Sequence, residues 1–374
     1  GGNLVSNGGA IYTNTNGNVF INGSNFINNT AVDNGGAIFI QNCGNFKASE
    51  TNFTGNYAKI HGGAIYTNTN GNINDCNFIN NNASVGGGFY GANANGLLNV
   101  TGSNFTDNTA TTGNGGAIVT SSNTIVNNSN FINNTATIGS GGAIVDYSNG
   151  DKYIKVINST FESNTAHDNG GAVAWTTGNV NITNSTFTDN NANITGGAVY
   201  SKGDVNIKDS NFTDNTATNI GGAVYGARNT DIQNSDFTNN LALEMGGAVY
   251  GFGDVNVKDS NFLNNTVIND NGGALYGNNN LVVSNSTFTN NTAVRGGAIY
   301  DVNKVDVECS NFTNNTLDTI FMGNGNITES EFTSIALPMI HVNNELSIDN
   351  TTFNGEDPSK KYISGFFHSG ELVD

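Results

Sequence analysis

The sequence is poor in proline, cysteine and charged residues, and each shortage excludes a class of protein. Among 374 residues there are 2 prolines, 3 cysteines and 11% charged residues, whereas about 25% charged residues is usual. Disordered chains are generally rich in proline and charge and poor in aromatic residues. The 22 phenylalanines and 12 tyrosines therefore indicate a folded protein. No run of about 18 apolar residues occurs, so we expect no membrane insertion in this segment.

Basic residues are especially scarce. Lys and Arg together number 12 against 30 Asp and Glu, which gives a formal net charge of −18. Affinity for nucleic acid and for anionic membrane surfaces comes largely from Lys and Arg, so neither is expected as a partner. Arg228 and Arg295 are the two arginines, which leaves little to grip a phosphate or a carboxylate.

The three cysteines, Cys43, Cys76 and Cys309, are an odd number at unrelated spacings. No Cys-x-x-Cys pair occurs, so neither a zinc site nor a disulfide framework is indicated. We expect buried or half-buried free thiols.

Asparagine and glycine dominate what is present. The chain has 74 Asn and 49 Gly, about a third of all residues. Both are poor helix formers, so a helical fold is disfavoured.

Two signatures recur in phase along the chain. Gly-Gly-Ala followed by an aliphatic residue begins at Gly8, Gly35, Gly62, Gly115, Gly141, Gly170, Gly196, Gly221, Gly246, Gly272 and Gly296, with the variant Gly86-Gly87-Gly88-Phe89 in the one gap. Phe-x-x-Asn begins at Phe26, Phe53, Phe78, Phe105, Phe131, Phe161, Phe187, Phe212, Phe237, Phe262, Phe288 and Phe312. Twelve matches to each signature establish a repeat.

Each repeat holds three short runs that suit strands, separated by Asn, Gly and Thr residues typical of turns. In the first repeat these runs are Ala10-Ile11-Tyr12, Val19-Phe20-Ile21 and Ser24-Asn25-Phe26. Nothing in the period is long enough for a helix, and the period is too short for a propeller blade. The pattern predicts an all-β solenoid, a parallel β-helix of about 14 coils of about 26 residues with three short strands per coil.

In a parallel β-helix, equivalent residues of successive coils stack in columns, and this explains why the same residue type recurs at the same repeat position. The Phe column is expected to point inward, and the Asn column to bond both its own bend and the next coil. The paired glycines are expected to supply positive φ or a close approach of neighbouring backbones.

The repeats divide the chain into two parts. Residues 1–315 are the regular β-helix, and residues 316–374, in which Gly-Gly-Ala is lost, are predicted to be degenerate coils with a C-terminal cap or transition segment. Pro338 and Pro358 both fall in the second part. This is expected, because proline has no backbone N–H to donate to the hydrogen-bond ladder of a regular coil. Lys360 and Lys361 are interpreted as part of the segment that protects the open strand edge at this end of the repeats.

The two signatures together resemble the repeats of chlamydial polymorphic outer-membrane proteins. The Asn-rich background also resembles adhesin-like surface proteins of methanogenic archaea. The resemblance covers residues 1–315. It implies a right-handed parallel β-helix, an exported location and a role in adhesion.

An enzyme acting on polysaccharide is the least favoured alternative. Polygalacturonases, which share this kind of fold, carry an Asn-Thr-Asp motif, and Asn229-Thr230-Asp231 matches it, but the accompanying motifs are missing. Asp204 and Asp254 share a column two coils apart, too far for paired acid–base work, and the histidines (His61, His167, His341 and His368) occupy four different repeat positions. No cofactor is predicted beyond a stray calcium ion at turn acids such as Asp33, Asp168 or Asp270.

One column is a candidate binding site. Aromatic residues follow the aliphatic residue of Gly-Gly-Ala, at Tyr12, Phe39, Tyr66 and Tyr90 and again at Tyr200, Tyr225, Tyr250, Tyr276 and Tyr300, with Trp175 near the gap. Side chains alternate along a strand, so these rings are expected to form an exposed ladder that suits sugar rings. The competing interpretation is that the tyrosines only stack and shield the strand, or point inward.

These features favour a non-enzymatic, extracellular, cell-surface adhesin-like protein whose partner is a glycan or protein on a host or neighbouring cell. The alternative is a structural module that associates end to end into a filament or surface layer. Frequent Asn-x-Ser/Thr sequons predict a glycoprotein; examples are Asn22, Asn99, Asn158, Asn193, Asn264 and Asn326.

Overall fold

The computed structural model describes residues 5–14, 16–93, 95–148, 150–355 and 361–365. It falls into two compact units, Gly1–Gly203 and Asp204–Asp374. Within the described residues the secondary structure consists of strands, bridges, turns and bends without any helix, and accordingly no helix there could span a bilayer.

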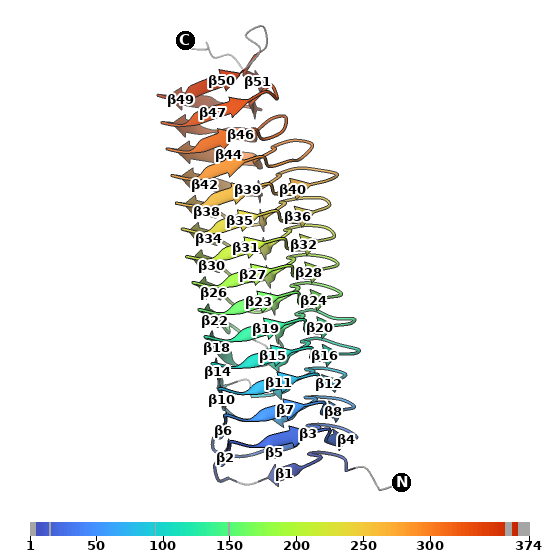
Figure 1. Ribbon diagram of the computed structural model, residues 1–374. Coiled ribbons are helices and arrows are strands. Elements are labelled where there is room, and N and C mark those ends of the chain that lie inside the picture. The colour runs from blue at the N-terminus through green and yellow to red at the C-terminus, as the bar shows by residue number, and fades with distance from the viewer. Residues whose placement is uncertain (1–4, 15, 94, 149, 356–360, 366–374) are drawn as a thin grey trace. The chain divides into compact units, whose positions relative to one another are not determined.

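Each coil of residues 1–203 contributes up to four short strands that pair in parallel with their equivalents in the next coil (Figure 1). First strands are β1 (Ile11–Asn14), β5 (Ile38–Gln41), β9 (Ile65–Thr67), β13 (Phe89–Gly91), β17 (Ile118–Thr120), β21 (Ile144–Asp146), β25 (Val173–Trp175) and β29 (Val199–Ser201). Second strands are β2 (Val19–Asn22), β6 (Phe46–Ser49), β10 (Gly71–Asn74), β14 (Leu97–Thr101), β18 (Asn123–Asn127), β22 (Ile154–Ile157) and β26 (Val180–Thr183). Third strands, which carry the Phe column, are β3 (Asn25–Ile27), β7 (Asn52–Thr54), β11 (Asn77–Ile79), β15 (Asn104–Thr106), β19 (Asn130–Ile132), β23 (Thr160–Glu162) and β27 (Thr186–Thr188). Fourth strands are β4 (Thr30–Ala31), β8 (Tyr57–Ala58), β12 (Asn82–Ala83), β16 (Thr109–Ala110), β20 (Thr135–Ala136), β24 (Thr165–Ala166) and β28 (Asn191–Ala192).

Residues 204–374 repeat this plan. First strands are β33 (Val224–Gly226), β37 (Val249–Gly251), β41 (Leu275–Gly277), β48 (Ile340–Val342) and β51 (Ile363–Gly365), and second strands are β30 (Val205–Lys208), β34 (Thr230–Gln233), β38 (Val255–Lys258), β42 (Asn280–Ser284) and β49 (Leu346–Asp349). First and second strands merge in β44 (Ile299–Glu308) and β46 (Ile320–Thr328). Third strands are β31 (Asn211–Thr213), β35 (Asp236–Thr238), β39 (Asn261–Leu263), β43 (Thr287–Thr289), β45 (Asn311–Thr313), β47 (Glu331–Ser334) and β50 (Thr352–Gly355); fourth strands are β32 (Thr216–Ala217), β36 (Leu241–Ala242) and β40 (Thr266–Val267).

These strands confirm the predicted all-β parallel β-helix of about 14 coils, because each unit has seven described third strands. The short fourth strands were not predicted. Their Thr-Ala or Asn-Ala sequences carry no strand signal of their own, and pairing with the neighbouring coil creates them.

The predicted inward Phe column is confirmed in each unit. Ring centroids of successive phenylalanines lie 4.5–5.1 Å apart in residues 1–203 and 4.7–5.1 Å apart in residues 204–374. Phe105 and Phe237, for example, are fully buried. Since a buried Phe removes a large apolar area from water, this column forms the main core of each unit.

Left-handed corners bracket the Phe strand in each of the twelve Phe-x-x-Asn repeats. In the coil of Phe237, Asn234 and Asn239 have φ of 47° and 55°. The equivalent corners elsewhere are mostly Asn, Asp or Gly, such as Gly102 and Asp107 around Phe105. These residue types tolerate positive φ better than others, so the corners account for part of the asparagine content, in addition to the ladder.

The paired glycines meet both predicted requirements. Gly221 has φ of +66°, and a Cβ on Gly222 would lie 2.0 Å from the carbonyl oxygen of Gly247 in the next coil. The first glycine of a pair therefore makes the bend, and the second lets the backbones of neighbouring coils approach.

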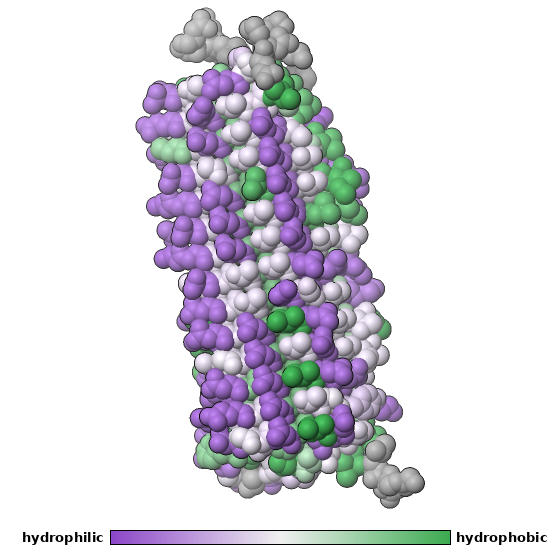
Figure 2. Space-filling model, viewed as in Figure 1, coloured by the Kyte–Doolittle hydropathy of each residue, from purple (hydrophilic) through white to green (hydrophobic). Residues whose placement is uncertain are grey.

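The predicted Asn ladder is also present. Asn81 donates from its backbone N–H and its Nδ2 to Oδ1 of Asn108 (3.1 and 3.0 Å), and its Nδ2 also donates to the carbonyl of Phe53 (2.9 Å). A second amide column lies on the outward side of the third strands, where Asn104 Nδ2 donates to Asn77 Oδ1 (2.9 Å). On the face drawn in Figure 2, hydrophilic residues gather in rows that run across successive coils.

Parallel pairing continues beyond residue 315. Phe332 and Phe353 extend the Phe column in register with Phe312, so residues 316–355 form irregular coils. The boundary at residue 315 and the terminal cap stay predictions; Pro358, Lys360 and His368 lie outside the described residues.

The burial of the three cysteines differs from the prediction at one position. Cys43 and Cys76 are buried, but Cys309 is exposed. Cys309 occupies a left-handed corner with φ of 48°, and the side chain at such a corner points away from the core.

Candidate functional site

The aromatic column follows the first strands of residues 204–374. Tyr225, Tyr250, Tyr276 and Tyr300 are partners in the parallel ladder of β33, β37, β41 and β44. Their ring centroids lie 5.1–5.3 Å apart. They alternate with buried aliphatic residues such as Val249 and Leu275, so they lie on the outward side of the strands, as predicted.

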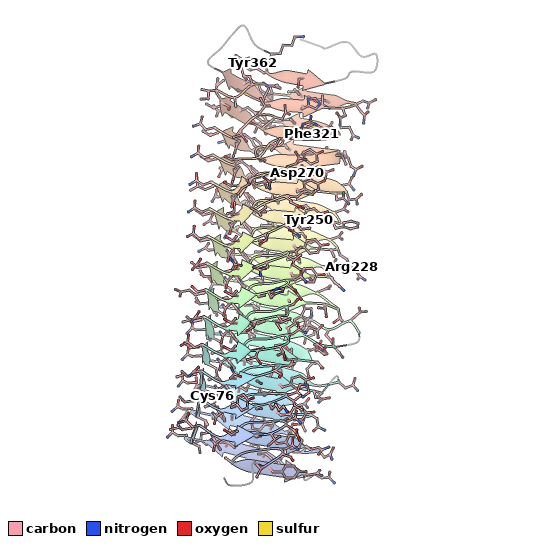
Figure 3. All side chains as sticks on the ribbon, turned by 90° about the vertical axis from the view of Figure 1, so that its right-hand side faces the viewer. Cys76, Arg228, Tyr250, Asp270, Phe321 and Tyr362 are labelled. Carbon is pink, nitrogen blue, oxygen red and sulfur yellow. The ribbon has the colours of Figure 1, made fainter. Side chains whose placement is uncertain are left out.

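The column is longer than the sequence indicated. Phe321 of β46 stacks on Tyr300 (4.7 Å), and His341 of β48 stacks on Phe321 (4.7 Å). Figure 3 shows Tyr250 and Phe321 along the same side of this unit. Both additions follow an isoleucine, as the tyrosines follow Ile, Val or Leu. The loss of Gly-Gly-Ala concealed that pattern.

Residues 1–203 contain a shorter version. Tyr12, Phe39, Tyr66 and Tyr90 stack with centroids 4.9–5.4 Å apart. Val119, Val145 and Ala174 then fill the column as a buried apolar cluster, and Tyr90 and Tyr200 pack against it. The chain itself therefore shows that valine can replace the aromatic ring in this column.

Apart from Tyr12, which is 56% exposed, the tyrosines of the column are buried or half-buried, which corrects the expected exposed ladder. Tyr250 is 9% exposed, and Tyr225, Tyr276 and Tyr300 are intermediate. Coil spacing is close to the distance at which rings stack, so the ring faces lie against one another. A sugar ring cannot lie on those faces within the column. Ring edges and hydroxyl groups form the outward surface.

Burial raises the pKa of the tyrosines in the column further above physiological pH. It raises the pKa of Tyr276 to about 12, with Tyr300, Tyr250, Asp270 and Asp301 adding to the rise. The pKa of Tyr250 is raised mainly by burial as well. These phenols are neutral at physiological pH and can both donate and accept hydrogen bonds.

Side chains just before the paired glycines flank the rings. In residues 204–374 these are Ile220, Met245, Asn271 and Arg295, which bridge in parallel from coil to coil. The Arg295 guanidinium lies 5.6 Å from the centroid of the Phe321 ring, within cation–π range. In residues 1–203, His61 lies 4.5 Å from the Tyr90 ring, and burial lowers its pKa.

Trp175 does not belong to this surface. It is fully buried, and its Nε1 donates to the carbonyl of Lys152 (3.0 Å). In the parallel ladder it pairs with Ser201, whereas Ala174 pairs with Tyr200. Because side chains alternate along a strand, Trp175 points inward, and its inclusion among the binding residues was wrong.

The candidate acids Asp204 and Asp254 are hydrogen-bonded to asparagines in the turns of neighbouring coils. Asn229 donates from its N–H to Asp204 Oδ1 (3.2 Å), and the N–H of Asp254 donates to Asn229 Oδ1 (3.3 Å). Asp254 also accepts from Asn280 Nδ2 (3.0 Å). Asn229 therefore separates the two carboxylates, as the repeat positions indicated.

Histidines and acids do not gather into a metal-binding cluster among the described residues. His167 contacts Asp168 (3.0 Å), and His341 contacts Ser364 (3.0 Å). A calcium ion at Asp33, Asp168 or Asp270 stays a prediction from the sequence.

Two family matches fit this geometry. Residues 141–317 match the family described as the right-handed beta helix region. Residues 23–41, 50–68 and 102–121 match the Chlamydia polymorphic membrane protein repeat. The chain is a right-handed parallel β-helix, and three of its segments are similar to the repeat of the chlamydial polymorphic membrane proteins. No curated protein and no solved structure matches it.

Each matched segment covers the same part of the repeat and leaves out the second strand. It starts at the left-handed corner before a Phe strand, at Gly23, Glu50 or Gly102. It then runs through the Phe strand and the paired glycines and ends at, or one residue after, the last residue of the next first strand. The repeat of the family therefore includes the strand that carries the aromatic column.

Proposed function

We propose that this β-helix is a non-enzymatic, adhesin-like protein displayed on the extracellular side of a cell surface. The observation that carries the proposal is the match of three segments to the repeat of the chlamydial polymorphic membrane proteins. The name of that family describes membrane proteins, and each matched segment contains a first strand, the strand that carries the aromatic column.

The partner is a glycan or protein on a host or neighbouring cell. Ring edges, neutral phenol groups and flanking side chains such as Met245 and Asn271 recur from coil to coil along the column. Each contact is weak, but repeated contacts along one rigid surface raise the overall affinity. The net charge of −18 keeps copies of the protein apart in solution.

Glycosylation is part of this proposal. The sequon asparagines Asn22, Asn158, Asn193, Asn264 and Asn326 are exposed, and Asn99 is half-buried. Asn158 and Asn264 lie at left-handed corners with φ of 49° and 55°. Exposed corners offer an attached glycan room that a strand interior does not.

Cell binding by beads coated with the full chain tests the proposal. We expect the beads to attach to epithelial or bacterial cells, and a Tyr250→Val/Tyr276→Val variant to attach at least severalfold less. Valine is the residue that the column itself uses at Val119 and Val145, so the fold should be kept. Thr238→Val, on the outward side of a Phe strand, is the matched control and should bind normally.

Other results would contradict the proposal. If wild-type beads bind no cells and the protein forms fibres as its concentration rises, the structural filament or surface-layer function is correct instead. Release of sugar from polysaccharide by the purified chain would contradict the non-enzymatic part.

A further inference from the structure

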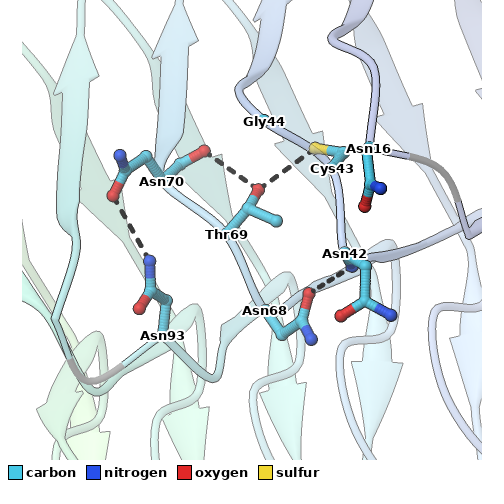
Figure 4. Close-up of a pocket in the computed structure, with 8 residues that line it drawn as sticks. All are labelled: Asn16, Asn42, Cys43, Gly44, Asn68, Thr69, Asn70 and Asn93. Carbon is cyan, nitrogen blue, oxygen red and sulfur yellow. Dashed lines mark hydrogen bonds between the residues drawn. The ribbon is translucent and has the colours of Figure 1, made fainter.

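A surface hollow of about 330 Å³ lies among the turns between first and second strands in residues 1–203 (Figure 4). Five asparagines from four successive coils line it, namely Asn16, Asn42, Asn68, Asn70 and Asn93. Cys43, Gly44 and Thr69 complete the lining. The hollow is separate from the aromatic column, because it lies at the turns beyond the first strands.

Differences in turn length create the hollow. The turn between β9 and β10 has three residues, 68–70, whereas the turns between β5 and β6 and between β13 and β14 have four and five. A short turn between two longer ones leaves a depression in the surface. Thr69 forms its floor together with Cys43, whose Sγ lies 3.3 Å from Thr69 Oγ1; both residues are buried.

In two of the lining asparagines, the side-chain oxygen accepts a hydrogen bond while the side-chain nitrogen has no acceptor among the described residues. Asn68 Oδ1 accepts from the backbone N–H of Asn42 (2.9 Å), and Asn70 Oδ1 accepts from Asn93 Nδ2 (3.3 Å). Within the described part of the chain, Nδ2 of Asn68 and of Asn70 have no acceptor, and the Asn16 amide has no partner. The hollow therefore offers positioned donors alongside a freely rotating amide.

The lining is polar but uncharged. None of the eight residues carries a formal charge or an aromatic ring, and the chain has a net charge of −18. An anion is repelled by that net charge, and a cation finds no carboxylate in the lining. The chemistry that remains is a neutral molecule rich in groups that both donate and accept hydrogen bonds, as hydroxyl groups do.

We propose that this hollow binds a neutral sugar. The inference rests on the proposed surface-binding function and gives it a ligand class. The volume lies at the lower end of the range for small-molecule sites, which suits one sugar residue, either free or at the end of a glycan. Because the site is open and gains little from apolar burial, the dissociation constant is on the order of 1 mM.

Ligand-observed saturation-transfer NMR with the full chain tests this site. The probes are galactose, mannose and N-acetylglucosamine, with glucuronate as the anionic comparison. We expect at least one neutral sugar to receive saturation and glucuronate to receive none. Asn68→Ala should weaken binding about fivefold, and Asn16→Trp, an exposed position at the mouth, should abolish it.

Asn278→Ala is the matched control. Asn278 follows β41 just as Asn68 follows β9, but it lies in residues 204–374 and away from the hollow. It should bind like the wild type, and melting curves should show all variants folded. The proposal is overturned if none of the three neutral sugars binds, if Asn68→Ala and Asn16→Trp both bind normally, or if glucuronate binds as well as the neutral sugars. Bead attachment to cells is measured on the same variants, so a failed sugar site is distinguishable from a failed adhesion function.

Discussion

Asn265 donates from both its backbone N–H and its side-chain Nδ2 to the single Oδ1 of Asn291, at 2.9 and 3.0 Å. Its Nδ2 also donates to the carbonyl of Phe237 (2.9 Å), while its own Oδ1 receives the same pair of bonds from Asn240. One buried amide therefore joins three successive coils.

The buried Asn ladder is expected to be a major source of stability. Asn265→Ala removes four side-chain hydrogen bonds and leaves the N–H of Asn240 buried without its acceptor. Leaving buried polar groups unpaired costs about 1–3 kcal/mol each, so we expect a loss of about 3 kcal/mol or more in the free energy of unfolding. Chemical denaturation measures it.

Asn261, four residues earlier, provides the comparison for this prediction. Its Nδ2 donates to Asp236 Oδ1 (2.7 Å) on the exposed side of the same region. Water can replace that bond, so Asn261→Ala should cost less than about 1 kcal/mol. Equal losses at the two positions would show that burial of the ladder does not matter.

The second glycine of a pair should tolerate no side chain. In Gly222→Ala the new Cβ would lie 2.0 Å from the Gly247 carbonyl oxygen, and backbone in two coils must separate. We expect a loss above about 3 kcal/mol by thermal or chemical unfolding. Gly23→Ala keeps a left-handed residue (φ +56°) with nothing within 4 Å of its Cβ, and should cost only about 1–2 kcal/mol. A milder effect at Gly222 than at Gly23 would contradict the close approach.

The sequence predicted the fold because every coil repeats the same contacts. Twelve copies of Phe-x-x-Asn place Phe over Phe and Asn over Asn, so the inward column, the ladder and the paired glycines were all predictable. Corners such as Asn234 and Asn239 were not, because Asn is so frequent that its role at left-handed positions has no separate signal.

The candidate site was predicted less well than the fold. Alternation along the strand placed Tyr250 outward, but the sequence does not reveal that stacking covers its ring faces. Trp175 was misplaced because its neighbourhood lacks aromatic residues, and one residue of offset reverses the side on which a side chain lies. The hollow around Asn68 arises from differences in turn length, which the repeat signatures do not record.

Trp175 provides a direct optical test of its position. It is the single tryptophan and is fully buried. We therefore expect blue-shifted emission that acrylamide quenches weakly and that shifts to longer wavelength on unfolding. Trp175→Phe leaves the half-buried Lys152 carbonyl without this donor, which should cost about 1 kcal/mol. Emission typical of a solvated indole in the native protein would contradict the inward placement.

In residues 204–374, Asp301 is a buried carboxyl in a column otherwise occupied by glycine, methionine and valine residues. It pairs with Gly277 and Met322 in the parallel ladders and is fully buried. Its Oδ1 accepts from the Asn303 N–H (2.7 Å), but among the described residues its Oδ2 has no hydrogen-bond partner. Burial, with a smaller contribution from Asp254, raises its pKa to about 7.

This raised pKa predicts a specific pH dependence of stability. Below pH about 4 the carboxyl is protonated in both the folded and the unfolded chain, so it does not make the free energy of unfolding depend on pH. Between pH about 4 and 7 the unfolded chain loses the proton while the folded chain keeps it, so the free energy of unfolding falls by about 1.4 kcal/mol per pH unit and then levels off. Asp301→Asn should remove this fall and be the more stable protein at pH 8, whereas Asp231→Asn, at an exposed position, should follow the wild type. Parallel curves for wild type and Asp301→Asn in denaturant titrations from pH 4 to 8 would show that folding does not raise the pKa of this carboxyl, because a group couples folding to pH only when its pKa differs between the folded and unfolded chains.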